Sequence, residues 1–352
     1  APSRASTGTP RPAATLTVTR PPDAMTAWLA LGEHVLAWAG CDRCGDGREN
    51  QLQVADRATG RVRTVARTSY PGGHLGWVGV DQDRLFWVDW QREQSLEDLG
   101  SNWRLRTCLL PGCQAMTIQT GAKDKTSPPY PTIAAGRLVV PLRPPWAVVA
   151  PGTTQVRIYD TATLEQTADQ RINASADEVH LAGDRLVFES MTPYPARPVT
   201  RPTPPRHTDI YTLRLGAPPQ DARALSRTGS DRLASASQTT VAWVHRDLPD
   251  GATGSIWAAA LTAGQAPRKV NDTLSDGVWL ADRWLVYVTS GAAELRALDL
   301  RTGKQLRPLA GPPDGAAWPA GVATHGNQVA FSTRNPDTLQ ETLHVTTLGT
   351  ST

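Results

Sequence analysis

The sequence AGDRLVFE, residues 182–189, joins a polar turn to a run of apolar residues. Six further stretches repeat this pattern, and successive copies start 44 to 55 residues apart. They are GEHVLAW (32–38), QDRLFWV (82–88), AGRLVVP (135–141), SQTTVAWV (237–244), ADRWLVYV (281–288) and HGNQVAFS (325–332). Repeats of this length are typical of arrays in which every unit packs against its neighbours.

A unit of this length holds four short strands but cannot bury both of its faces alone, so the units must pack around an axis. The sequence therefore predicts an all-β fold, a seven-bladed β-propeller of four-stranded antiparallel blades. We name the strands of a blade a to d from the axis outward, and the repeated pattern contains strand b. The predicted propeller fills residues 15–352 as a single domain, and a flexible Ser/Thr/Pro-rich segment, residues 1–14, precedes it.

The two ends of the chain are predicted to share one blade. The last unit has candidate strands at 319–323, 328–332 and 342–347, and the residues that follow are too few for a strand d. The alternating stretch 15–19, Thr-Leu-Thr-Val-Thr, belongs to no unit of its own. We expect it to supply the outer strand of the last blade, because closing the ring removes an open sheet edge.

Three units carry a similar turn between strands c and d: LQVADRATGRV (52–62), VRIYDTATLEQ (156–166) and LRALDLRTGKQ (295–305). An Asp ends the strand and accepts hydrogen bonds from the turn, and Thr followed by Gly or Leu completes it. In these turns the chain resembles the TolB-like and WD-like bacterial propellers, and the resemblance implies architecture only. The Gly-His and Trp-Asp pairs of true WD repeats do not recur here.

Composition indicates the compartment and excludes some partners. The net charge of +3 with 20% charged residues is too small to indicate nucleic acid or an anionic membrane as a partner. Only four of the 36 basic residues are lysine, which indicates a GC-rich source such as an actinobacterium. The sequence has no apolar run of 18 residues and therefore no predicted transmembrane segment. Its Ser/Thr/Pro-rich start is typical of a mature terminus after signal-peptide cleavage, or of a tether, so we expect a secreted or cell-surface monomer.

The four cysteines fit an oxidising compartment. Cys108 and Cys113 flank a Leu-Leu-Pro-Gly turn, where hairpin residues come close enough for a disulfide, and Cys41 and Cys44 would form the second pair. Four cysteines permit three connectivities, and a zinc site or free thiols are the alternatives. The acidic loop 41–50 is an alternative calcium site, although it lacks the alternating acidic pattern of calcium loops. We expect no metal.

The loops suggest which face binds. In a propeller the d–a and b–c connections share one face, here called the long-loop face, and the a–b and c–d turns share the other, the tight-turn face. The b–c connections are long in the first five units: 40–50, 90–103, 142–154, 190–208 and 246–254. This asymmetry favours a site offset toward the first four blades, unless the loops simply vary in length. Loop 190–208 has six prolines and three arginines, including Arg201, and is either a cationic binding arm or a surface excursion.

Aromatic side chains supply most candidate ligand contacts. Tryptophan is abundant, and several copies fall in predicted a strands or in loops of the long-loop face. Flat rings around a concave mouth suit sugars or apolar ligands, and the alternative is packing between blades. The predicted ligand-binding residues are Trp28, His74, Tyr130, His180, Trp279 and Trp318 around the mouth, and Trp90, Trp103, Trp146 and Arg201 in the loops.

No sequence motif identifies an enzyme or a cofactor site, so no cofactor is expected. The seven histidines are scattered, but His74 and His180 could join Glu178, Asp231 and Arg246 in a polar cluster near the mouth. The leading hypothesis is an extracytoplasmic binding propeller whose ligand is a glycan, a peptide or another protein. The alternative is a lyase or hydrolase acting on a polysaccharide or glycoside. A third hypothesis is the sensor domain of an anchored receptor.

Overall fold

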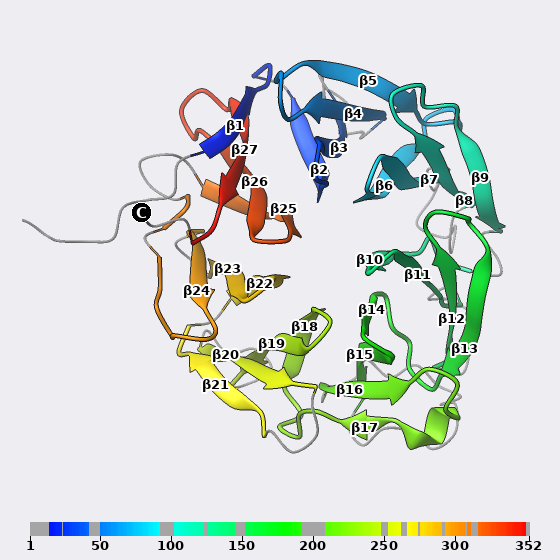
Figure 1. Ribbon diagram of the computed structural model, residues 1–352, viewed down its shortest axis with the longest axis vertical. Coiled ribbons are helices and arrows are strands. Elements are labelled where there is room, and N and C mark those ends of the chain that lie inside the picture. The colour runs from blue at the N-terminus through cyan, green and yellow to red at the C-terminus, as the bar shows by residue number, and fades with distance from the viewer. Residues whose placement is uncertain are drawn as a thin grey trace, which may run out of the picture.

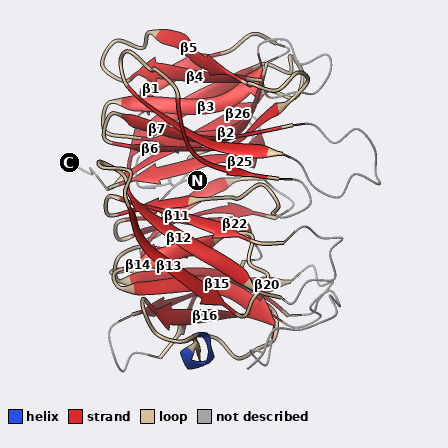
Figure 2. Cartoon of the chain, turned by 90° about the vertical axis from the view of Figure 1, so that its right-hand side faces the viewer, coloured by secondary structure: helices blue, strands red, loops and turns tan. Residues whose placement is uncertain are grey.

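The chain folds into a ring of antiparallel sheets (Figure 1). The computed structural model describes residues 14–22, 24–41, 50–91, 102–122, 126–144, 152–191, 208–247, 253–261, 266–273, 275–290, 293–306, 308–310 and 316–349. Over these ranges the one helix is a short 3-10 turn, η1 (Pro219–Asp221), at the rim of the ring (Figure 2). No helix among them has the length and apolarity needed to cross a membrane.

Seven sheets form the blades, and in the first six the strands follow one another in the chain. Blade 1 contains β2 (Met25–Leu31), β3 (Val35–Cys41), β4 (Gln51–Asp56) and β5 (Val62–Arg67). Blade 2 contains β6 (His74–Asp81), β7 (Arg84–Trp90), β8 (Trp103–Leu109) and β9 (Met116–Gly121). Blade 3 contains β10 (Thr132–Ala134), β11 (Arg137–Leu142), β12 (Thr154–Asp160) and β13 (Gln166–Ile172). Blade 4 contains β14 (Val179–Ala182), β15 (Arg185–Met191), β16 (Thr208–Arg214) and β17 (Arg223–Ala224). Blade 5 contains β18 (Asp231–Ala236), β19 (Thr240–Arg246), β20 (Gly254–Ala260) and β21 (Arg268–Asn271).

The last two blades complete the ring and confirm its predicted closure. Blade 6 contains β22 (Ser275–Ala281), β23 (Trp284–Thr289) and β24 (Leu295–Asp299), and blade 7 contains β25 (Ala316–His325), β26 (Gln328–Arg334), β27 (Glu341–Thr347) and β1 (Ala14–Thr19). The N-terminal strand β1 pairs antiparallel with β27, as the stretch 15–19 predicted. Blade 6 departs from the prediction of four strands, because isolated bridges at Gln305 and Ala310 replace a continuous strand d in its described part.

The repeated pattern builds the core. Every residue of β3 and of β23 is buried, since a strand b lies between two neighbouring strands and packs on both faces. Core clusters join neighbouring blades: Trp87 of blade 2 packs in one cluster with Val54 of blade 1. Four tryptophans, Trp38, Trp87, Trp243 and Trp284, belong to this core and are at most 4% exposed.

Side chains at the start of strand c form hydrogen bonds with the backbone of the d–a connection that leads into the next blade. In blade 3 the Thr154 hydroxyl donates to the carbonyl of Ala174 and accepts from the amide of Ala176. In blade 4 the Asp209 carboxylate accepts from the amides of Thr228 and Gly229. Buried polar groups need such partners, and these bonds hold the start of each following strand a in place.

The disulfide prediction is confirmed for one pair. Cys108 and Cys113 are bonded across the turn that joins β8 and β9, with their Cα atoms 4.7 Å apart. Cys41 is also disulfide-bonded, and its predicted partner Cys44 lies outside the described residues, as does the acidic loop 42–49.

Candidate functional site

Four aromatic rings meet where strands a begin and strand b of blade 2 ends, on the long-loop face. The rings of Trp28 and Tyr130 lie 5.5 Å apart, centroid to centroid, and Tyr130 meets Trp90 edge-on at 6.4 Å. Trp90 in turn lies 6.5 Å from the ring of His74. The chain of rings crosses blades 1, 2 and 3, whose strands a are innermost in the ring (Figure 1). All four residues are half-buried, so each keeps part of its surface accessible. We call this group the aromatic cluster.

Backbone placement explains why these rings meet. His74 and Trp90 are opposite one another in the pairing of β6 with β7, so their side chains share one face of the blade. Gly76 lies beneath Trp90, and a Cβ atom at that position would overlap the indole ring. The missing side chain therefore lets Trp90 lie close against the strand.

A set of charged side chains continues from the aromatic cluster into blade 4. The Arg143 guanidinium, which follows β11, forms an ion pair with the Asp177 carboxylate, which precedes β14. Tyr130 lies beside this pair and forms an isolated parallel bridge with Glu178. The Glu178 carboxylate is in turn 3.3 Å from Nε2 of His180, without an aligned hydrogen bond. We call Arg143, Asp177, Glu178 and His180 the polar arc.

Burial dominates the electrostatics of this region. It raises the pKa of Asp177 above its usual value, and the neighbouring Arg143 opposes the rise. Burial likewise lowers the pKa of Arg143 and raises that of Tyr130. The ion pair is unequally exposed, since the side chain of Arg143 is 9% and that of Asp177 46% accessible. The arginine side chain is thus mostly enclosed, whereas the Asp177 side chain is partly enclosed and partly exposed to solvent.

The arrangement suits a ligand that has both a flat apolar face and hydroxyl groups. Indole and phenol rings offer faces for stacking, a guanidinium donates hydrogen bonds, and carboxylates accept them. A sugar hydroxyl can donate to a carboxylate and accept from a guanidinium at the same time.

Several predicted site residues lie elsewhere. The prediction that Trp103 is a loop residue is wrong, because Trp103 begins β8 opposite Trp90, is fully buried, and donates its indole N–H to Thr126. Trp279 is half-buried in β22 and packs against the core shared by blades 6 and 7. Trp318 lies in β25, with its side chain outside the described residues, and Trp146 and Arg201 lie outside them entirely.

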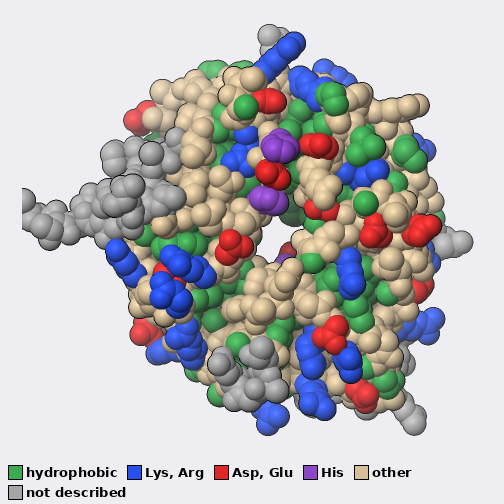
Figure 3. Space-filling view, viewed as in Figure 1, with side chains coloured by type: hydrophobic (Ala, Val, Ile, Leu, Met, Phe, Trp, Pro, Cys, Tyr) green, Lys and Arg blue, Asp and Glu red, His purple; other side chains and the backbone are tan. Residues whose placement is uncertain are grey.

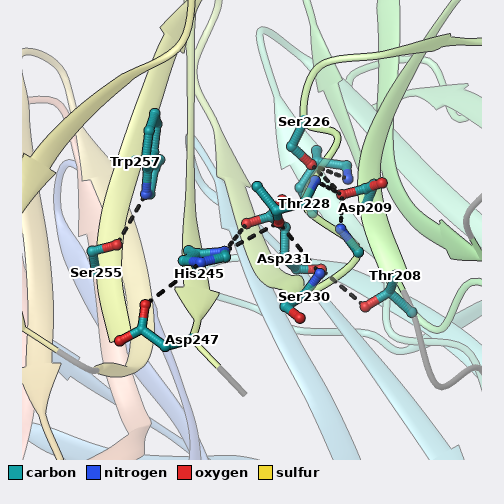
Figure 4. A network of polar contacts seen from close by, with 12 residues as sticks. Thr208, Asp209, Ser226, Thr228, Ser230, Asp231, His245, Asp247, Ser255 and Trp257 are labelled. Carbon is teal, nitrogen blue, oxygen red and sulfur yellow. Dashed lines mark hydrogen bonds and ion pairs between the residues drawn. The ribbon is translucent and has the colours of Figure 1, made fainter. Parts of the chain in front are cut away.

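The predicted polar cluster is divided: His74 belongs to the aromatic cluster, and Arg246 ends β19 in blade 5. His180 and Glu178 belong to the polar arc, whereas Asp231 pairs with His245 in blade 5, where a separate network joins blades 4 and 5 (Figure 4). The sequence prediction overlooked Arg143 and Asp177. The signal for both was positional, since Arg143 follows a strand b and Asp177 precedes a strand a, and both positions belong to the long-loop face.

No known family model matches the sequence, and no curated protein matches it. Solved structures match it in fold. The β-propeller domain of the Trilobed protease from Pyrococcus furiosus superposes with a TM-score of 0.64 at 12% identity, over 93% of this chain and 96% of that domain. An oligogalacturonate lyase in complex with manganese superposes with a TM-score of 0.57 at 14% identity, over 94% of this chain and 92% of the lyase chain.

Acylaminoacyl peptidase from Pyrococcus horikoshii gives a TM-score of 0.63 at 10% identity over 93% of this chain. The match covers 52% of the peptidase, so this chain spans about half of that enzyme. The chain has the seven-bladed propeller fold. Identities this low establish the fold and carry no activity over to this chain.

Proposed function

We propose that this chain is an extracytoplasmic binding propeller whose ligand is a glycan, held at the aromatic cluster and the polar arc. The observation that carries the proposal is a chain of rings from three blades that leads, through Tyr130, to a partly exposed ion pair. The Asp177 side chain is 46% exposed, so a ligand that lies on these rings can reach its carboxylate. The Cys108–Cys113 disulfide and the disulfide formed by Cys41 support the extracytoplasmic location, because disulfides persist in oxidising compartments.

The roles follow from the geometry. Trp28 and Tyr130 stack on the face of a sugar ring, and Trp90 closes the edge of the same surface. Arg143 and Asp177 bind the hydroxyls that project beyond the stacked face. Trp318, Trp146 and Arg201 stay predicted contacts, and the monomeric state is part of the proposal.

A glycan array followed by calorimetry with the best oligosaccharide tests the proposal. Replacing Trp28 or Tyr130 with Ala should weaken binding at least about 10-fold, because buried aromatic anchors carry most of the affinity of such sites. Trp279→Ala is the matched control, since it removes another half-buried tryptophan from a strand a, on the far side of the ring. Equal losses in Trp28→Ala and Trp279→Ala would show that the rings only pack.

An enzyme acting on a polysaccharide or glycoside is the second candidate. Asp177, Glu178 and His180 place two carboxylates and an imidazole together, and burial raises the pKa of Asp177, as a general acid requires. Reducing-end and unsaturated-product assays on the glycans that bind would reveal turnover. Turnover lost in Asp177→Asn with binding retained would support this candidate, and bound glycan that stays intact would reject it.

A further inference from the structure

A second group of polar side chains lies where β19 of blade 5 ends, on the long-loop face. Figure 4 shows this group from close by. At its centre is His245, the next-to-last residue of β19, which pairs with Ser255 of β20. Nδ1 of His245 lies 3.0 Å from Oδ1 of Asp231, and Nε2 lies 3.7 Å from Oδ1 of Asp247. The ring of Trp257 stands edge-on to the imidazole at 6.5 Å.

The inner half of this group is fixed by burial and hydrogen bonding. Asp231 is fully buried, and its second oxygen accepts from the Thr228 hydroxyl at 2.5 Å. Its carbonyl accepts from the hydroxyl of Thr208 in blade 4. The imidazole therefore has a rigid support on its Nδ1 side.

That support determines which imidazole nitrogen is available. A carboxylate accepts hydrogen bonds, so Asp231 favours the tautomer with the proton on Nδ1 and leaves a lone pair on Nε2. This nitrogen lies 3.7 Å from Oδ1 of Asp247, whose side chain is 53% exposed and is also an acceptor. Two acceptors facing each other repel unless a proton or a cation lies between them. The nearby ammonium of Lys269 is bound to Asp272 at 2.5 Å.

We propose that His245 and Asp247 bind a divalent transition-metal ion, with zinc the best fit. Imidazole nitrogen with carboxylate oxygen is a donor pair that zinc accepts, at about 2.0–2.2 Å per bond. At a tetrahedral angle those bonds place the two donor atoms about 3.4 Å apart, so a small rotation of the exposed Asp247 side chain completes the site. A carboxylate behind the imidazole, as Asp231 is here, is the usual partner of a metal-binding histidine.

The remaining coordination positions belong to water. Among the described residues no set of three or more His, Cys, Asp or Glu side chains is arranged around one point, so this part of the chain supplies two protein ligands. Such a site is weak and open. It is independent of the proposed glycan site.

Calorimetric titration of the chelator-treated full chain with ZnCl2 at pH 7 tests this site. The wild type should bind one zinc ion that is lost in both His245→Gln and Asp247→Asn. Asp231→Asn should weaken zinc binding about 10- to 100-fold, the usual effect of removing the carboxylate behind a metal-binding histidine. His344→Gln is the matched control, because His344 is a partly buried strand histidine outside both proposed sites, with its Nε2 3.0 Å from the Thr333 hydroxyl, and the change should leave zinc binding unchanged.

Two results would overturn the proposal. One is that the wild type binds no zinc at concentrations up to about 1 mM. A Kd of about 1 mM corresponds to a binding free energy of only about 4 kcal/mol. That result would mean that a proton alone bridges His245 and Asp247. The other is zinc binding that survives unchanged in His245→Gln and Asp247→Asn. Asp247 is exposed, so its variant should stay folded and keep the test decisive if Asp231→Asn does not fold.

Discussion

Arg20 and Glu341 are 321 residues apart in the sequence, and Nη1 of the arginine lies 2.7 Å from Oε2 of the glutamate. Both side chains are almost fully buried, at 3% and 6% exposure. Arg20 also donates to the hydroxyl of Thr26 and the carbonyl of Cys41, so the pair joins β1, β27 and blade 1. The similar Trilobed protease domain is described as having an open velcro topology, whereas this ring is closed by strand pairing and by this ion pair.

Replacing Arg20 with Met should strongly destabilise the fold. The change leaves the Glu341 carboxylate buried without its countercharge, which typically costs about 3–5 kcal/mol. The double variant Arg20→Met/Glu341→Met should recover much of that loss, because no unpaired charge stays buried. Urea unfolding of the two variants gives both free energies.

The exposed pair Arg214–Asp184 provides the control for this experiment. Its atoms are 2.8 Å apart, close to the distance in the buried pair, but the side chains are 70% and 59% exposed. Arg214→Met should therefore cost less than about 1 kcal/mol. Equal losses in Arg20→Met and Arg214→Met would show that the buried pair does not stabilise the closure.

The sequence predicted the ring well because its signals are local and repeated. A polar turn followed by a buried strand b recurs in every blade, and the lack of a strand d at the C-terminus matches the spare strand at 15–19. The predicted site was less accurate, because its members meet only through topology. Arg143 and Asp177 belong to different blades, and the sequence around each has no motif. Trp103 follows a polar stretch, 91–102, and so was predicted as loop, but pairing with Trp90 makes it the first residue of β8.

Trp103 and Trp28 should respond differently to truncation. Trp103 is fully buried, so Trp103→Ala should cost about 3–5 kcal/mol through lost burial and a cavity. Trp28 is half-buried, and Trp28→Ala should cost roughly 1–2 kcal/mol, because an exposed ring surface contributes no transfer free energy. Denaturant unfolding measures both changes. A larger loss in Trp28→Ala would place that ring in the core rather than at a surface site.

The Cys108–Cys113 disulfide closes a short loop, with a sequence separation of 5. A short loop removes little conformational entropy from the unfolded chain, so the disulfide should stabilise the fold only modestly. The double variant Cys108→Ala/Cys113→Ala should lower the free energy of unfolding by about 2 kcal/mol. Unfolding without reductant is the measurement, since a reductant would also act on the disulfide at Cys41. A loss far above this value would mean that the pair also supports the packing of β8 against β9.

The turns after strand c should make stability depend on acidic pH. The Asp160 carboxylate accepts hydrogen bonds from the amides of Thr163 and Ala162, which hold its pKa below the usual 3.8. Asp56 has the same arrangement, chiefly through the amide of Thr59, and its pKa is lowered in the same way. A carboxyl group whose pKa is lower in the folded state stabilises the fold above its unfolded pKa, and this contribution is lost as the pH falls through the folded value.

Asn335 shows how the charge can be separated from the hydrogen bonds. It occupies the equivalent position of a similar turn between β26 and β27, and its amide oxygen accepts from the amides of Asp337 and Thr338. Asp160→Asn should therefore keep the turn and lose only the pH-dependent part, whereas Asp160→Ala should be less stable at every pH. Urea unfolding at pH 7, 5 and 3 measures the difference between wild type and Asp160→Asn. That difference should shrink below about pH 3.8, and a difference that grows in acid would contradict the assignment of the lowered pKa to these bonds.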